Sequence, residues 1–411
     1  MLGRNALGRL LAARAGGLFR EVDYVFFPAG VEGCHEPEEG FRVHEIPGRS
    51  DPDEPPTWMS RWSGLREGWR AVASVAEEAR PTVVNAVEPF LSGLLAGGVA
   101  RRLRIPRVTT VVSNYRLSWE VARLNPVPFL PPSLSFSLER RILAASDRIH
   151  VDCDHYADYV TGRGASPSRV RRIPRYADPV FYRRDPDPEI WARLEVPDPT
   201  PLVYVGRLSP EKYAMELART FLVLARHQPD RHLVVVGGGG PLEQIFLDRL
   251  RQGGVGDRVL VRRGLSREEI VSVMGRAGAL LATHAGYALL EAALAGAPVV
   301  AYDYEWHPEL IRTGDTGILV PYRDSEAMAG GAMRLLDRPG EARRMAAALR
   351  GRARQGYGLE DHLSALRRSY AELLSPGAAA RDPGEETTPR VSNGEHAAGG
   401  RVRGSGPGGS R

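Results

Sequence analysis

The sequence predicts an α/β protein in which two Rossmann-like domains face each other across a cleft, followed by a disordered C-terminal tail. Three observations lead to this fold class. Short apolar runs alternate with helical patterns along most of the chain, as in parallel sheets covered by helices. A stretch rich in Pro and Asp, 183–200, interrupts the alternation near the middle. In the second half, a strand runs directly into four glycines and a helix, which is typical of a nucleotide-binding domain.

The first domain is expected at 1–182. It opens with a basic amphipathic pattern at 2–20, which favours a surface helix of an α/β domain over a helix that lies on a membrane. Short apolar runs then predict strands at 22–27, 41–46, 82–86, 107–112, 148–151 and 170–173. Helical patterns between them predict helices at 65–79, 89–103, 133–145 and 155–163.

The stretch at 183–200 is the expected linker, with a short helix at 189–194. The second domain, 201–357, is more regular and predicts strands at 201–205, 232–236, 259–261, 280–282 and 299–302. Its helices are expected at 214–228, 242–252, 267–277, 288–295, 305–312, 325–336 and 340–355. A closing segment at 358–374 carries the last helix, 360–374. The tail at 375–411 has almost no large apolar residues, so we expect it to be disordered.

Composition limits the class of function and the compartment. The net charge of +5 and a pI near 9.3 suit an anionic ligand or a membrane surface but are too mild to indicate nucleic acid. Cys34 and Cys153 lie far apart without metal-ligand spacing, which excludes a disulfide framework and fits a reducing compartment. The sequence holds no long apolar run that would indicate a transmembrane helix or a secretory signal. We therefore expect a cytoplasmic protein, with peripheral contact at the inner face of the membrane as an open alternative.

Basic residues in this chain are almost all arginine. Of its 55 lysines and arginines, one is a lysine, Lys212, in the loop after the first strand of the second domain. Lysine is a compact point charge, whereas arginine is a planar fork, so a tight loop that neutralises a phosphate can require lysine. Arg207 stands five positions earlier, next to Gly206, which lets a ligand approach the backbone. The two cations could hold a diphosphate; the alternative is a solvated surface turn.

Another polar feature lies where the strand predicted at 280–282 meets the helix predicted at 288–295. Glu291 is surrounded by apolar residues of the predicted helix, and a carboxylate there is costly unless it is paired. Two ribose hydroxyls would satisfy it, as would an internal salt bridge to an arginine. His284, just before the helix, could donate to a phosphate or sugar oxygen or be only structural.

These motifs carry a resemblance to a known family. Residues 201–322 resemble the donor-binding domain of glycosyltransferase family 4, whose members are retaining enzymes of the GT-B fold. The matching stretches read LVYVGRLSPEK, LVVVGGGGPLE, GLSREEIVSVMGRAGALLATHAGYALLEAALAGAPVVAY and PELIRTGDTGILVP. The first domain is similar more loosely, through PTVVNAVEPFLSGLLAGGVARRLRIPRVTTV and ASDRIHVDCDHYADYVTGRGASPSRVRRIPRYADPVFY.

The resemblance implies a role for each matching residue. Arg207 and Lys212 would bind the donor diphosphate and stabilise the departing nucleoside diphosphate, with no metal and no cofactor. Glu291 matches the second Glu of the E-x7-E motif of the family and would hold the ribose. The donor-binding residues implied in addition are Gly206, Gly237, Gly238, Thr283, His284, Gly286, Tyr287 and Leu290.

The chain departs from the family pattern at three places. Thr283 stands where the first Glu of E-x7-E usually contacts the transferred sugar. Ser113 and Asn114 stand where the family carries a His, so the sequence names no base or sugar-orienting residue in the first domain. Family members begin with a strand and a Gly-rich loop, whereas Met1 here begins in the following helix. We expect the gene to encode that strand and loop in frame upstream of Met1.

The sequence thus predicts a retaining glycosyltransferase that moves a sugar from a nucleotide-sugar donor to a glycan, a lipid-linked sugar or a small molecule. The altered first Glu and the absent loop leave two alternatives open: a catalytically weak GT-B partner or scaffold, and a sugar-nucleotide epimerase. A phosphorylase that uses pyridoxal phosphate is disfavoured, because it needs a lysine for the Schiff base and Lys212 already has another role.

Overall fold

The computed structural model describes residues 17–29, 33–47, 58–284 and 286–375. Most of the helix predicted at 2–20 and the tail predicted to be disordered from 376 onwards lie outside the described residues. The prediction of a helix as far as residue 20 is wrong, because residues 17–20 form a turn and a bend. Gly17 has a φ of +95°, a backbone conformation that a right-handed helix does not contain.

The second half of the chain forms one parallel sheet of six strands, in the order β10-β9-β8-β11-β12-β13. The strands are β8 (Leu202–Gly206), β9 (Leu233–Gly237), β10 (Val259–Arg262), β11 (Ala279–Ala282), β12 (Val299–Tyr302) and β13 (Ile318–Val320). Successive residues point to opposite faces, so Val203 and Leu280 enter one core cluster while Tyr204 and Leu281 enter the other. Both faces are buried, as the continuous apolar strands of this half predict.

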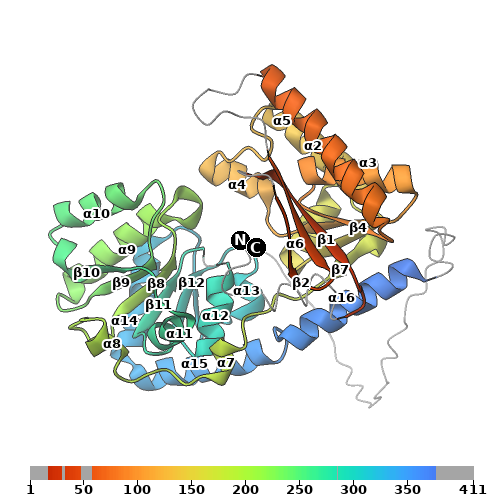
Figure 1. Ribbon diagram of the computed structural model, residues 1–411. Helices are drawn as coiled ribbons and strands as arrows, with labels where there is room; N and C mark the ends of the chain where they lie inside the picture. The colour runs from red at the N-terminus through yellow and green to blue at the C-terminus, as the bar shows by residue number, and fades with distance from the viewer. Residues whose placement is uncertain (1–16, 30–32, 48–57, 285, 376–411) are drawn as a thin grey trace, which may run out of the picture. The chain divides into compact units, whose positions relative to one another are not determined.

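Helices cover both faces of this sheet (Figure 1). One face carries α9 (Ala214–His227), α10 (Glu243–Gln252) and α14 (Ser325–Asp337). The other carries α11 (Arg267–Gly275) and α12 (Tyr287–Ala295), with α15 (Pro339–Arg354) packed against α12. Short helices lie in the loops: η2 (Pro210–Lys212), η3 (Gly256–Arg258) and α13 (His307–Leu310).

The first half holds two sheets within the described residues. A parallel sheet runs in the order β4 (Val84–Val87), β5 (Arg107–Val111), β6 (Arg148–Val151) and β7 (Val170–Arg172). The second sheet has the order β1 (Val22–Ala29), β3 (Phe41–Pro47) and β2 (Gly33–Glu38). The parallel pairing expected from the sequence holds except at β2, an unpredicted strand that pairs antiparallel with β3. The connection from β2 to β3 is short, and only antiparallel neighbours can be joined that way.

The helices of the first half are α2 (Trp58–Ala79), α3 (Leu91–Leu103), α4 (Tyr115–Ala122), α5 (Pro132–Ala144), α6 (Asp154–Gly162) and the single turn η1 (Pro167–Arg169). Within the predicted linker, the short helix expected at 189–194 forms as α8 (Ile190–Arg193), and an unpredicted short helix, α7 (Val180–Arg183), lies just before it. Helix α8 packs on the second half, where the Trp191 indole donates a 3.0 Å hydrogen bond to the Arg276 carbonyl.

The last helix was predicted at 360–374 and forms as α16 (Leu359–Leu374); it packs on the first half of the chain (Figure 1). Its apolar side packs on Val108 and Ile173 through Leu366 and Tyr370. Ser369 lies 2.8 Å from Nε2 of the buried His150. The helix therefore gives the first parallel sheet a buried face that its own segment does not supply.

Candidate active site

The order of the six-stranded sheet reverses between β8 and β11, which pair side by side. Parallel α/β sheets bind ligands outside the carboxyl ends of their strands at such a reversal. The loop after β8 carries Gly206, Arg207 and Lys212, and the loop after β11 carries Thr283 and His284. The fold therefore brings the two predicted cation and sugar-binding segments to one edge of the sheet.

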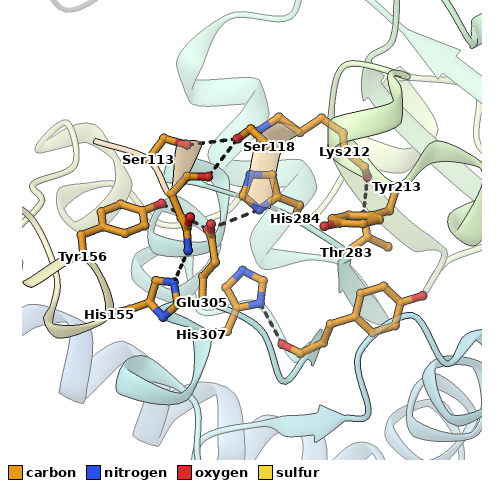
Figure 2. Close-up of polar contacts among 12 residues, drawn as sticks. Ser113, Ser118, His155, Tyr156, Lys212, Tyr213, Thr283, His284, Glu305 and His307 are labelled. Carbon is orange, nitrogen blue, oxygen red and sulfur yellow. Dashed lines mark hydrogen bonds and ion pairs between the residues drawn. The ribbon is translucent and has the colours of Figure 1, made fainter. Parts of the chain in front are cut away.

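Lys212 lies at the start of α12. A Cβ atom placed on Gly286, the residue before that helix, would be 3.9 Å from Lys212 Nζ. The Thr283 hydroxyl donates a 2.9 Å hydrogen bond to the Lys212 carbonyl and ties the two loops together (Figure 2). Burial lowers the pKa of Lys212, so its positive charge is costly without an anion nearby. An ammonium beside free helix N–H groups forms an anion-binding arrangement.

Arg207 is placed differently. Its side chain is 68% exposed, and its guanidinium lies 3.0 Å from the Glu211 carboxylate, four residues along the chain. The two cations are thus unequal: Lys212 is held in the site, whereas Arg207 lies at its edge with a counter-charge of its own.

The glycine run supports the loop that carries both cations. Gly237, Gly238, Gly239 and Gly240 all have φ between +63° and +98°, the left-handed region that favours glycine. Gly238 N donates to the Gly206 carbonyl at 3.0 Å, and Leu208 N donates to the Gly239 carbonyl at 2.7 Å. The run therefore lies against the loop after β8 and fixes its backbone.

Glu291 lies one turn into α12, between α11 and the segment before α7. Burial raises its pKa to about 7. Arg267 is the cation that acts on it, but Arg267 is paired with Asp178 at 2.9 Å. Glu291 forms no hydrogen bond or ion pair with any described residue, so the internal salt bridge that was its alternative role is not formed.

The remaining predicted residues divide between the site edge and the core. Tyr287 is 51% exposed, and its ring lies 5.8 Å from the Arg175 guanidinium carbon. Leu290 and Thr283 are fully buried, Leu290 within the core cluster. Asn114 caps α4 by accepting from Leu117 N at 3.2 Å, so the position of the family His serves here as a helix N-cap.

The structure adds a residue that the sequence reasoning missed. Glu305 follows β12 and has a left-handed φ of +46°. Its side chain is 3% exposed; Oε2 accepts a 3.1 Å hydrogen bond from the Tyr156 hydroxyl and lies 3.8 Å from His284 Nδ1 (Figure 2). Burial raises the pKa of Glu305 to about 7 and lowers the pKa of His284. The sequence offered only a weak signal, an acidic residue three positions after the buried strand β12.

Two further polar features are a buried ion pair next to this cluster and a partly buried carboxyl on the first sheet. Arg175 forms a buried pair with Asp152 at 2.6 and 3.1 Å, and its guanidinium carbon lies 4.2 Å from the centre of the Trp306 ring. On the first sheet, Glu88 follows β4 with a φ of +92°, and burial raises its pKa to about 7. Among the described residues, no group of three or more His, Cys, Asp or Glu side chains is placed to share a metal ion.

Comparison with known proteins decides the family. Residues 187–352 match the model of the glycosyl transferases group 1, and residues 5–175 match the glycosyl transferase 4-like domain. A D-inositol 3-phosphate glycosyltransferase of Frankia alni is 30% identical over 305 residues, which cover 71% of this chain and 74% of the relative. The chain belongs to glycosyltransferase family 4. It is a glycosyltransferase, as the sequence motifs predicted.

Other members of the family extend this likeness. A GDP-mannose-dependent alpha-(1-6)-phosphatidylinositol monomannoside mannosyltransferase of Mycolicibacterium smegmatis is 28% identical and covers 92% of this chain and 97% of its own length. Among solved structures, sucrose-phosphate synthase of Thermosynechococcus elongatus has a TM-score of 0.75 at 20% identity, over 90% of this chain and 93% of that one. Anabaena HepE in complex with UDP-glucose has a TM-score of 0.63 at 16% identity, over 80% and 87%. These structures confirm the GT-B fold of the family 4 enzyme.

No helix in the described part of the chain is both long and apolar enough to cross a membrane.

Proposed function

We propose that this family 4 enzyme is a retaining glycosyltransferase that binds a nucleotide sugar over the carboxyl ends of β8, β9 and β11 and passes the sugar to an acceptor. One observation carries the proposal: the Lys212 ammonium lies at the N-terminal end of α12, at the reversal point of the sheet. A diphosphate is the ligand that this pairing of a half-buried cation with helix N–H groups suits best.

The donor would lie along the same edge of the sheet. Its diphosphate would contact Lys212 and the amide of Gly286, with Arg207 at the solvent side. Its ribose would place two hydroxyls against Glu291, whose carboxylate lacks any partner among the described residues and whose pKa is raised to about 7 by burial. Gly237 and Gly238 would line the nucleotide pocket.

Catalysis would rest on the leaving group. In retention, the leaving phosphate and the acceptor nucleophile share one face of the sugar, so the enzyme has little acid–base work to do. The negative charge that grows on the departing diphosphate is stabilised by a preorganised cation and by helix N–H groups, which need no rearrangement at the moment of reaction. No metal enters this scheme.

The relatives suggest which ligands to test first. Their names specify an inositol phosphate acceptor in one case and GDP-mannose with a phosphatidylinositol mannoside in another, and HepE was solved with UDP-glucose. We therefore infer that an inositol-bearing or mannosylated inositol acceptor is the first class to try, with GDP and UDP sugars as donors.

The test is a thermal-shift screen of sugar nucleotides followed by turnover with these acceptors. The anomeric configuration of the product, measured by proton NMR, should match that of the donor. An inverted product would refute retention. Donor binding without turnover on any acceptor would favour a partner or scaffold, and conversion of the donor alone into an isomer would indicate an epimerase.

A further inference from the structure

The position that matches the first Glu of the family motif no longer offers a carboxylate. Thr283 is fully buried, and its hydroxyl donates its proton to the Lys212 carbonyl at 2.9 Å. The threonine therefore serves to hold two loops together. A sugar attached to the diphosphate would meet no acidic group on this loop, although sugars are usually held by hydrogen bonds to charged acceptors.

We infer that Glu305, from the loop after the neighbouring strand, supplies this carboxylate and binds hydroxyls of the transferred sugar. The inference rests on the proposed function, because it assumes a nucleotide sugar on Lys212. It assigns to Glu305 a role in sugar recognition that the sequence motifs place elsewhere.

The sheet topology puts Glu305 in the right place. Strand β12 pairs with β11 in register, from Leu280 opposite Val299 to Ala282 opposite Ala301. The loops that follow these two strands therefore open side by side on one edge of the sheet. Lys212 is close enough for its charge to act on the Glu305 carboxyl, so the carboxylate faces the diphosphate region from the next strand.

The carboxylate and its neighbour His284 retain hydrogen-bonding capacity that a sugar hydroxyl could use. Oε2 accepts from Tyr156, but no described residue donates to Oε1. His284 Nδ1 is buried without a hydrogen-bond partner and lies 3.8 Å from Oε2, too far for a direct hydrogen bond. A hydroxyl oxygen about 2.8 Å from both atoms would accept from the imidazole and donate to the carboxylate. The charged groups that face Glu305 are His284, Lys212, Arg175 and Asp152.

The backbone adds an independent observation. Glu305 has a φ of +46°, a conformation that costs free energy for any residue with a Cβ. Other left-handed residues such as Arg104 and Arg123 end helices, where this conformation is common. Glu305 ends no helix and instead precedes α13. Strain of this kind is retained where the side chain is needed in one place.

Tyr156 comes from α6 in the first half of the chain, so its hydrogen bond to Glu305 also joins the two halves. The competing explanation is that Glu305 only makes this contact. Glu309 provides a control, because it lies four residues further on and also makes contacts across the halves: it accepts from His155 N at 3.1 Å and pairs with Arg172 at 3.1 Å. If Glu305 binds the sugar, its substitution weakens binding of the nucleotide sugar and that of Glu309 does not. If both carboxylates only join the halves, the two substitutions should have the same effect on binding.

The experiment measures two affinities on each full-length variant by calorimetry: GDP or UDP alone, and GDP-mannose or UDP-glucose. We expect Glu305→Gln to bind the nucleotide sugar at least tenfold more weakly and the free nucleotide as well as wild type does. Glu309→Gln should leave both affinities unchanged. An equal loss for both ligands, or no loss for the nucleotide sugar, would overturn the assignment.

A second variant protects the test against misfolding. Glu305→Gly removes the carboxylate and relieves the left-handed strain. It should therefore melt no lower than wild type, yet bind the nucleotide sugar at least tenfold more weakly than wild type does. A Glu305→Gly protein that keeps full affinity for the nucleotide sugar would overturn the inference. A wild-type protein that binds neither nucleotides nor nucleotide sugars would instead refute the proposed function.

Discussion

The environment of a single lysine separates two cations that the sequence treats alike. Lys212 is half-buried beside Gly286, and its carbonyl accepts a hydrogen bond from Thr283. Arg207 is mostly solvent-exposed and paired with Glu211. A buried charge near the leaving group contributes more to transition-state stabilisation than an exposed, screened one. We therefore expect Lys212 to dominate and Arg207 to contribute less.

Replacing Lys212 tests this directly. Lys212→Ala should remove about 2–4 kcal/mol of leaving-group stabilisation, measured as kcat/KM, since it deletes one preorganised donor. Lys212→Arg should also be poor, because the larger planar fork does not fit the space of a point charge. Arg207→Ala is the comparison and should lose clearly less. Near-normal turnover in Lys212→Arg would contradict the argument.

Glu291 gives a second test at this scale. Because it forms no ion pair with the described residues, Glu291→Gln leaves no buried cation unpaired and should melt close to wild type or above it. An amide accepts less well from two ribose hydroxyls, so donor affinity should fall tenfold or more, about 1.4 kcal/mol. The measurements are the melting temperature without ligand and calorimetry with the donor. A large drop in melting temperature with unchanged affinity would show a structural role.

How far the sequence could predict the site depends on the distance between partners along the chain. Lys212, Gly286 and Glu291 lie in motifs that follow neighbouring parallel strands and resemble those of the family, so their neighbourhood could be inferred although Lys212 is far from the other two along the chain. Glu305 could not be identified, because Tyr156 and His284 reach it from distant segments and its left-handed φ has no signature in the sequence.

At the scale of elements, the glycine run and the loop after β8 act as one unit. Both Gly239 and Gly240 have positive φ, +72° and +98°, so an alanine at either position pays a similar backbone cost. A Cβ on Gly240 would also lie 2.7 Å from the Leu208 carbonyl, whereas one on Gly239 meets nothing within 4 Å. A comparison of the two alanine variants therefore measures the effect of the Leu208 contact alone, apart from the backbone cost that both share.

We expect Gly240→Ala to displace that loop and weaken donor binding well beyond Gly239→Ala, by about tenfold or about 1.4 kcal/mol. Calorimetry with the nucleoside diphosphate measures the difference. Equal affinities in the two variants would mean that the glycine run does not position Lys212 and Arg207.

The elements themselves were predictable where the apolar pattern is long and buried, as in β8, β9 and α9. The pattern missed β2, β13, α4 and the four-residue helix α7, for different reasons. β2 is almost wholly exposed and lacks an apolar face, and β13 has only three residues. α4 has no buried residue, and its start depends on the Asn114 cap more than on an apolar stripe.

At the scale of the whole molecule, contacts between distant segments complete both halves. The short helices α7 and α8 pack on the second half, and α16 packs on the first. The sequence predicted α8 within a linker and α16 as a closing helix but did not predict α7, and the burial of all three depends on surfaces that only the assembled sheets present. The domain boundaries remain predictions.

Three carboxyl groups in both halves share one property that yields a prediction for the folded chain. Burial raises the pKa of Glu88, Glu291 and Glu305 to about 7, well above that of an exposed carboxyl. A raised native pKa contributes stability that is present below the unfolded pKa and is lost as pH rises through the native pKa. Between about pH 4.5 and 7, the unfolded chain ionises these carboxyls while the ligand-free native chain keeps them protonated, so each group lowers the free energy of unfolding by about 1.4 kcal/mol per pH unit.

Buried histidines such as His150 and His307 act in the opposite direction, because their lowered pKa values make stability fall as pH drops below about 6.5. The pH profile of one protein would mix the two effects, so the test compares variants that share the histidines. Relative to wild type, Glu88→Gln and Glu291→Gln should gain melting temperature between pH 5 and pH 8. Glu341→Gln should show no such gain, because Arg334 lowers the pKa of Glu341 below this window.

Donor binding should make the melting temperature depend on pH in the opposite direction. Ribose hydroxyls stabilise the ionised form of Glu291, so the rise in melting temperature caused by the donor should increase between pH 6 and pH 8 in wild type. Removing the titrating group in Glu291→Gln should flatten that increase, while Glu88→Gln should keep it, since Glu88 lies on the first sheet, away from the proposed ribose. An increase that is equally steep in Glu291→Gln would place the proton release at another group and remove Glu291 from the donor site.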